Sequence, residues 1–133
     1  MNKRDLTLDK YGISKKRYRE LKYFCEQYPE WKNAVANQTY LSAVTYDGMP
    51  HSASVGDPTQ AKAMNFSEKS ANIDLIESVA VSAAGDMWVW LIRNICYEVP
   101  VDWLILSESM PMSKAQFYDY RRYFFFLLDQ KRR

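Results

Sequence analysis

The chain has 133 residues, 47% hydrophobic and 26% charged, which is the composition of one ordinary folded domain or of one domain with an appended arm. Its aromatic content of 15% excludes a fully disordered chain, and its four glycines and five prolines argue against a turn-rich β-sandwich or barrel. The longest charge-free stretch has 14 residues, which is too short to span a bilayer, so we expect no membrane partner.

The net charge of +2 conceals an uneven distribution of charge along the chain. Residues 1–32 carry nine basic and five acidic side chains, and residues 111–133 carry six basic and two acidic ones. Residues 33–110 carry only three basic side chains against nine acidic ones. Basic segments at both ends are the electrostatic footprint of a phosphate-backbone partner, although solvated helix faces give the same pattern.

The first well-defined helix is predicted over residues 15–28. Ser14 is a good N-cap residue, and an apolar stripe with helical spacing runs from Tyr18 to Tyr28. Pro29 ends this helix and suits the first turn of the next one, which we expect to reach about Asn37. The basic side chains of the first helix are candidates for contact with DNA: Lys15, Lys16, Arg19 and Lys22.

The cysteines Cys25 and Cys96 are too few for a disulfide framework or a zinc site. Both fall in apolar helical patterns, so we expect buried thiols in a reducing cytoplasm. His51, the only histidine, lies in a loop-like stretch with no second histidine, no cysteine pair and no nearby nucleophile. Because the sequence also contains no catalytic triad, no Cys/His pair and no glycine-rich phosphate loop, we expect no metal, no cofactor and no enzyme activity.

A second helical region is predicted to begin at Asp57-Pro58, where the aspartate can cap the helix and the proline suits its first turn. Gly85 interrupts this region, and Asp86 can cap a further apolar helix; one long helix through Gly85 is the alternative. The predicted organisation is a set of N-terminal basic helices at 1–44, a loop at 45–57 and a helical domain at 58–133.

The C-terminal residues are predicted to form two helices joined by a tight turn. A short helix runs from Val101 to about Glu108, and Ser113 begins a longer one. Ser113 and Gln116 have the spacing of a capping box, in which each side chain satisfies a backbone N–H of the other residue. A short helix, a turn and a longer helix with a polar and basic face follow the plan of a helix-turn-helix, here at residues 101–130.

In a helix-turn-helix the second helix enters the major groove with its N-terminus first. Lys114 and Gln116 lie on the first turn of that helix, where lysine can donate to guanine and glutamine can read adenine. Arg121 and Arg122 are better placed for backbone phosphates, which fix the register without reading the sequence. An ordinary helical hairpin is the alternative, because the run 123–128 is apolar around most of the helix. The remaining candidate contacts are Tyr118, Lys131, Arg132 and Arg133.

Motifs in three parts of the chain carry a family resemblance. They are Tyr11-Gly12-Ile13-Ser14-Lys15-Lys16-Arg17-Tyr18, then Asp57-Pro58-Thr59 with the later Ile76-Glu77, and finally Val101-Asp102-Trp103-Leu104, Met110-Pro111-Met112-Ser113 and Phe117-Tyr118-x-Tyr120-Arg121-Arg122. These segments resemble the RinA/ArpU-type transcriptional regulators of Gram-positive phages and prophages, which are related to a promoter-reading region of sigma factors. The resemblance implies a DNA-binding activator of phage late genes that acts with host RNA polymerase in the cytoplasm of the bacterial host cell. It also implies that the helix beginning at Ser113 is the recognition helix.

We therefore expect an all-α fold, a small multi-helix domain with a C-terminal helix-turn-helix, and a phage or prophage regulator whose partner is double-stranded DNA. The sequence does not decide whether the chain forms a homodimer. It also does not decide whether the residues around Asp47-Gly48 form a two-stranded hairpin. One alternative function is a protein-interaction module that binds and inhibits or redirects a host protein, using the acidic middle segment and the tryptophans. Another is a packaging subunit that resembles a small terminase. Residues 33–56 match no motif.

Overall fold

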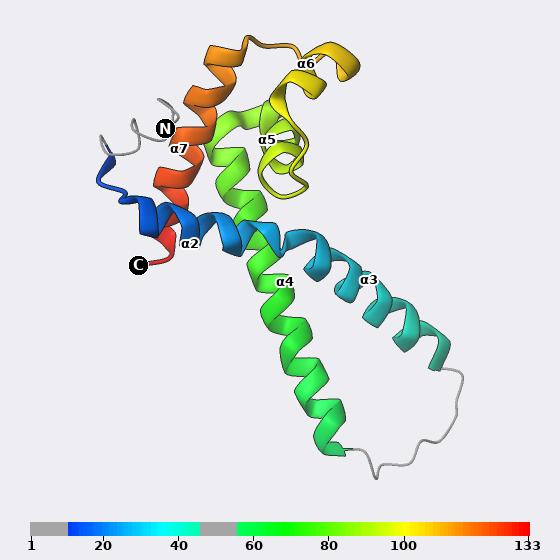
Figure 1. Ribbon diagram of the computed structural model, residues 1–133. Helices are drawn as coiled ribbons and strands as arrows, with labels where there is room; N and C mark the ends of the chain where they lie inside the picture. Colours follow the sequence, from blue (N-terminus) through cyan, green and yellow to red (C-terminus); the bar gives the residue numbers. More distant parts are fainter. Residues whose placement is uncertain (1–10, 46–55) are drawn as a thin grey trace. The chain divides into compact units, whose positions relative to one another are not determined.

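The computed structural model describes residues 11–45 and 56–133, and the side chains of 11–37 and 66–133. Within these residues every regular element is a helix and none is a strand, so the predicted all-α fold class is confirmed (Figure 1). The elements in chain order are α2 (Lys15–Glu26), α3 (Tyr28–Thr45), α4 (Gly56–Ala84), the short 3-10 helix η3 (Gly85–Met87), α5 (Trp88–Ile95), α6 (Val101–Glu108) and α7 (Lys114–Lys131).

The chain divides into two compact units. Unit 1 combines the described part of Met1–Gln27 with Leu75–Arg133, so it holds α2, the end of α4, η3, α5, α6 and α7. Unit 2 is Tyr28–Asp74, with α3 and the first part of α4. The division predicted from composition, with a loop at 45–57, stays a prediction, since most of that loop lies outside the described residues.

α2 begins where the sequence predicts because Ser14 caps it. The Ser14 hydroxyl oxygen accepts a hydrogen bond from the backbone N–H of Arg17 at 3.1 Å, which satisfies one of the N–H groups left open at a helix start. The inward face of α2 is apolar, with Leu21, Phe24 and Cys25 buried. Local capping and the apolar stripe therefore agree on the same helix.

Gly85 separates α4 from α5. Its φ of +55° lies in the left-handed region, which glycine adopts without the strain of a Cβ atom. The alternative of one unbroken helix through this position is therefore wrong. Asp86 lies inside η3 and does not cap α5, whose N-cap is Met87 without a side-chain hydrogen bond.

α6 and α7 have the bounds that the sequence predicts, with a connection at 109–113. Ser109 ends α6 in a left-handed conformation with a φ of 54°. Ser113 then caps α7, and its hydroxyl accepts a hydrogen bond from the Gln116 backbone N–H at 3.1 Å. Only this half of the predicted capping box is formed, and the Gln116 side-chain Nε2 donates to the Tyr120 hydroxyl at 3.5 Å. That the α6–α7 pair is a DNA-binding helix-turn-helix stays a prediction.

α3 continues to Thr45 and passes the predicted end near Asn37. Residues 38–45 mix serine and threonine with apolar side chains and form no helical stripe, so no local pattern predicts that the helix extends through them. A strand at residues 39–45 is excluded by this helix. Asp47-Gly48 and His51 lie outside the described residues.

Each α-helix of unit 1 contributes buried side chains to its core. Cys25 and Cys96 lie in it as free, buried thiols, as the sequence predicts. A hydrogen bond between these two thiols, followed by burial, raises the pKa of Cys96. The most deeply buried larger side chains of unit 1 are Ile13, Leu21, Ile76, Leu91, Ile95, Leu104, Phe117, Phe124, Phe125 and Leu128.

One stretch, Phe66–Ile95, is long and apolar enough to meet a simple criterion for a membrane span. Its best window has a mean hydropathy of 1.4, and 39% of that window is buried within the protein. Core helices of soluble proteins meet the same criterion, and Gly85 breaks this stretch into two helices. The finding is weak evidence for a membrane span, and the expectation of no membrane partner stays a prediction.

Candidate nucleic-acid interface

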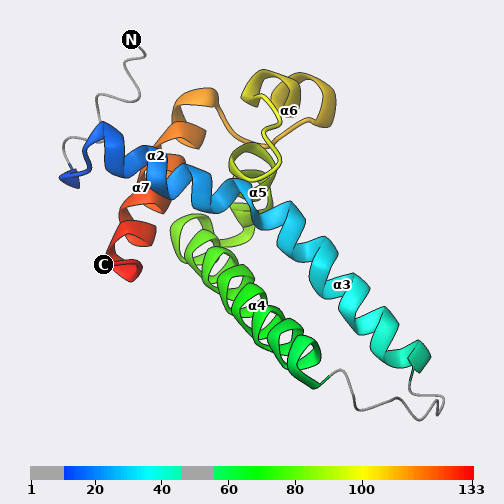
Figure 2. The same ribbon diagram turned by 60° about the horizontal axis from the view of Figure 1, so that its bottom comes forward.

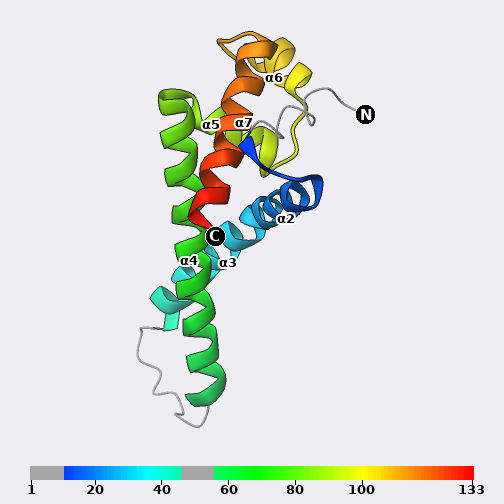
Figure 3. The same cartoon turned by 90° about the vertical axis from the view of Figure 1, so that its left-hand side faces the viewer.

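The candidate interface extends along α7, whose two ends have different neighbours. α6 lies beside the N-terminal end of α7, and α2 lies beside its C-terminal half (Figures 2 and 3). The two ends are about 27 Å apart, because α7 has 18 residues and an α-helix rises about 1.5 Å per residue. The predicted site residues on this helix therefore form two separate groups.

At the N-terminal end of α7, Lys114 is held by an acid on α6. Its Nζ atom lies 3.0 Å from Asp102 Oδ1, and both side chains are exposed to solvent. Gln116 is exposed as well, and the first turn of α7 contains no acidic residue. A helix N-terminus carries partial positive charge. This end is therefore suited to an anionic partner, which would replace Asp102 as the counter-charge of Lys114.

A shallow, open pocket of about 410 Å³ follows on the next turns of α7. Arg122 forms an ion pair with Asp119 across one turn of the helix, and Asp119 is itself mostly exposed. Each described basic side chain of the pocket thus has an acidic neighbour. The pocket is lined by Lys114, Ala115, Tyr118, Asp119 and Arg122.

The side chain of Arg121, which the sequence predicts to contact phosphate, points toward other helices of unit 1. Its Nε donates to Asn94 Oδ1 at 3.0 Å and its Nη2 donates to the Tyr18 hydroxyl at 2.9 Å. Its guanidinium also lies 5.1 Å from the centroid of the Phe125 ring. Arg121 thereby links α2, α5 and α7, and its Nε and Nη2 groups both donate within the protein.

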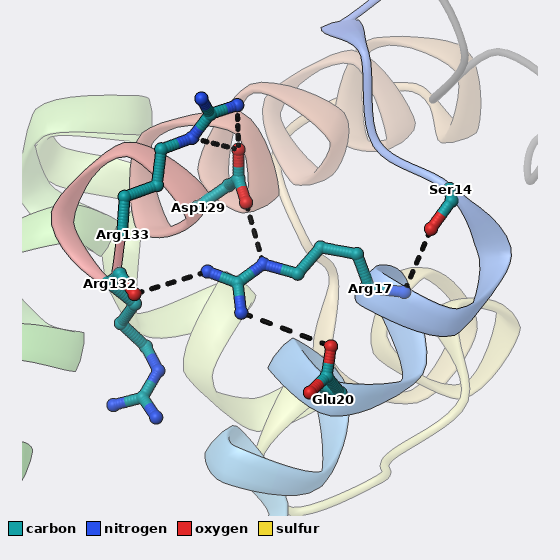
Figure 4. A network of polar contacts seen from close by, with 6 residues as sticks. All are labelled: Ser14, Arg17, Glu20, Asp129, Arg132 and Arg133. Carbon is teal, nitrogen blue, oxygen red and sulfur yellow. Dashed lines mark hydrogen bonds and ion pairs between the residues drawn. The ribbon is translucent and has the colours of Figure 1, made fainter.

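At the C-terminal end of α7, the buried carboxylate Asp129 joins this helix to α2. Arg17 Nε donates to Asp129 Oδ1 at 2.7 Å, and Arg133 Nη2 donates to Asp129 Oδ2 at 3.0 Å (Figure 4). Arg17 also donates to the Arg132 carbonyl at 3.3 Å and lies 4.0 Å from Glu20. Only 4% of the Asp129 side chain is exposed. Burial alone would raise the pKa of Asp129, but the hydrogen bonds from Arg17 and Arg133 outweigh it and hold the pKa below its usual value.

The Asp129 network brings basic side chains from two distant parts of the sequence into one region of unit 1. Arg132 packs its guanidinium 3.7 Å above the Phe24 ring of α2. Within residues 11–37 and 66–133, no carboxylate forms an ion pair with Lys15, Lys16, Arg19 or Lys131. Lys22, in contrast, is 3.7 Å from Glu26. We define the α2–α7 basic cluster as the exposed residues Lys15, Lys16, Arg19, Lys131, Arg132 and Arg133.

Sequence reasoning missed Asp129 and Arg17, which organise this cluster. One signal was present: Asp129 stands four residues after Phe125, so it falls on the buried stripe of α7. A charged residue on an apolar stripe needs a partner, because a buried unpaired charge is very unfavourable. The identity of that partner could not be read from the sequence, since Arg17 is 112 positions away.

The tryptophans differ in their exposure. Trp31 is buried, whereas 57% of Trp103 is exposed on α6 together with 82% of Leu106.

Comparison of the chain with protein-family models, with curated proteins and with solved structures finds no match.

Proposed function

We propose that the chain is a DNA-binding transcriptional regulator of a phage or prophage, of the late-gene activator type, which acts with host RNA polymerase. The supporting observation is the start of α7. This helix is capped by Ser113, follows α6 after a short connection, and presents Lys114 and Gln116 to solvent on its first turn. The resemblance to RinA/ArpU-type regulators adds the transcriptional role.

The chemistry of base reading assigns different tasks to the exposed side chains of α7. Gln116 can pair with the N6 and N7 edge of adenine, and Lys114 can donate to guanine after leaving Asp102. Tyr118 lies one turn and Arg122 two turns beyond Lys114; both are half-buried, and their polar ends suit phosphate oxygens. Arg121 has no part in this proposal, because its Nε and Nη2 groups hold it against Asn94 and Tyr18.

The test is fluorescence anisotropy with labelled duplexes that tile the intergenic regions of the phage or prophage of origin, at two salt concentrations. We expect one duplex to bind more tightly than the rest, with affinity that falls as salt rises. Gln116→Ala should cost about 1–3 kcal/mol on that duplex and little on the others. Gln27→Ala is the matched control, since Gln27 is an exposed glutamine at the C-terminal end of α2, outside α7 and outside the basic residues at the start of α2. No binding to any duplex at low salt would refute the proposal.

A protein-interaction module is the second candidate, and the exposed pair Trp103 and Leu106 favours it. Tryptophan is enriched at the centres of protein interfaces. Capture of host proteins by the full chain, with nuclease present, would be compared with capture by Trp103→Ser/Leu106→Ser. A protein retained despite nuclease and lost in this variant would support the second candidate over the first. A ring-sized mass in light scattering would instead favour a small-terminase-like subunit.

A further inference from the structure

The α2–α7 basic cluster is the strongest group of unopposed charge within the part of the chain that the structure describes. Four of its six cations, Lys15, Lys16, Arg19 and Lys131, form no ion pair with a described carboxylate. The remaining two, Arg132 and Arg133, are exposed although each also has a contact inside unit 1. An opposing charge at this surface is Glu20, whose carboxylate lies 4.0 Å from Arg17.

Two of these cations occupy unfavourable positions for the isolated protein. Lys15 and Lys16 stand in the first turn of α2, where the helix carries partial positive charge, and no acidic residue stands in that turn. Acidic side chains are the stabilising choice at a helix start, and cations there are repelled. A bound anion would remove this repulsion. The position of the two lysines therefore indicates a binding role over a stabilising one.

We propose that the α2–α7 basic cluster binds the phosphate backbone of duplex DNA irrespective of sequence and supplies most of the salt-dependent affinity. This inference rests on the proposed DNA-binding function and deepens it. The start of α7 then selects the sequence, while the cluster at the far end of the helix holds the backbone. The assignment follows from charge, because Lys114 and Arg122 have acidic neighbours and most cations of the cluster have none.

The surroundings of the cluster favour DNA over other anionic partners. A membrane-surface helix inserts an apolar face beside its basic one, but the apolar face of α2 is buried through Leu21, Phe24 and Cys25. The cations are also distributed over two helices, α2 and α7. Distributed cations match a polymer with regularly spaced phosphates, whose bound counterions they displace.

The experiment compares the full chain with Lys15→Gln/Lys16→Gln. The matched control is Lys32→Gln/Lys69→Gln, which removes the same charge from unit 2. Anisotropy is measured between about 50 and 200 mM salt on the preferred duplex and on a scrambled duplex of equal length. Circular dichroism confirms that each variant is folded.

We expect the variant to bind both duplexes more weakly, by about tenfold at the lower salt, with their affinity ratio preserved. Its plot of log K against log salt should be shallower by about 1.8, because each lost phosphate contact removes about 0.9 from the slope. The control should match the parent. Unchanged binding of both duplexes by the folded variant would overturn the inference and leave the proposed function standing.

Two further outcomes separate the inference from the proposed function. If the parent shows no duplex preference and the variant still loses affinity, the cluster is confirmed as a backbone-binding surface and the proposed regulator is refuted. Poly-glutamate serves as the competing probe. If it displaces the scrambled duplex as effectively as unlabelled DNA of equal charge, the cluster selects no phosphate backbone and the inference is overturned in favour of an acidic protein segment.

Discussion

The two ends of α7 use charge in opposite ways. In the N-terminal half, Lys114 and the half-buried Arg122 pair with the exposed acids Asp102 and Asp119. At the C-terminal end the acid, Asp129, is buried, and exposed cations surround its position. Exposed pairs contribute little to stability and exchange partners easily, whereas a buried charge must keep its partners. One helix can thus have an end that is free to rearrange on binding and an end that is fixed by the fold.

The largest expected difference between the two ends concerns stability. Asp129→Asn removes the counter-charge of Arg17 and Arg133 and weakens the joint between α2 and α7. We expect a loss of about 1.5–3 kcal/mol in the free energy of unfolding, below the value for a fully buried pair because both arginines are partly exposed. Urea unfolding would measure it. Asp119→Asn is the control and should stay within about 0.5 kcal/mol of the parent; equal losses in both variants would contradict the comparison.

The pH dependence of stability should show the same contrast. The pKa of Asp129 is lowered in the folded protein, so its contribution is complete above the unfolded value of about 3.9 and is lost as pH falls through the lower folded value. The stability difference between the parent and Asp129→Asn should therefore be constant from about pH 7 to 5 and should shrink below about pH 4. Urea titrations at several pH values would test this, and a difference that persists at the lowest pH would argue against the charge as its source.

Two adjacent arginines separate folding from binding. Arg121→Gln should lower stability by about 1–2 kcal/mol, because it leaves Asn94 and Tyr18 without their donor. Arg122→Gln loses a pair with the exposed Asp119, so it should leave stability within about 0.5 kcal/mol of the parent while it weakens DNA binding. Thermal unfolding and anisotropy on each variant would check both. Unchanged DNA binding by folded Arg122→Gln would remove this end of α7 from the backbone contacts.

The smallest expected effect has the opposite sign. Lys15→Glu/Lys16→Glu places acids at the positive end of α2 and should raise stability by about 0.5–1 kcal/mol, a few degrees in the unfolding temperature. The same variant should bind DNA more weakly than the parent. Lys114→Glu is the informative counterpart at the start of α7, where loss of the Asp102 pair and repulsion from that acid should cancel the gain. Calorimetry would measure the unfolding temperature of each variant. A lower unfolding temperature for Lys15→Glu/Lys16→Glu than for the parent would show that these lysines stabilise the fold.

Local sequence signals predicted the helix starts and stops well. Ser14 and Ser113 are capping residues with the expected hydrogen bonds, and Gly85 stops α4 because it takes a left-handed conformation. α3 was predicted too short, since residues 38–45 lack both a stripe and a stop signal. Local signals work where a single residue fixes the backbone.

The candidate site was only partly predictable, because its organisation depends on long-range pairs. The sequence singled out the basic residues at both ends of the chain but gave no sign that Asp129 and Arg17 join them. It also could not distinguish Arg121 from Arg122. The residues that follow them are apolar around most of the helix, so the pattern did not show which arginine faces α2. That distinction required the position of Tyr18.

The span of 112 residues between Arg17 and Asp129 has a consequence for the order of folding. Closing a loop of that length costs about 4 kcal/mol in chain entropy by the logarithmic estimate, before the contact returns any free energy. Contacts within α5, α6 and α7 close far shorter loops, so we expect them to form first and the docking of α2 to come late. In a chain that has not finished folding, the α2 and α7 parts of the basic cluster would then lie apart. We therefore expect strong binding of a polyanion only by the fully folded protein.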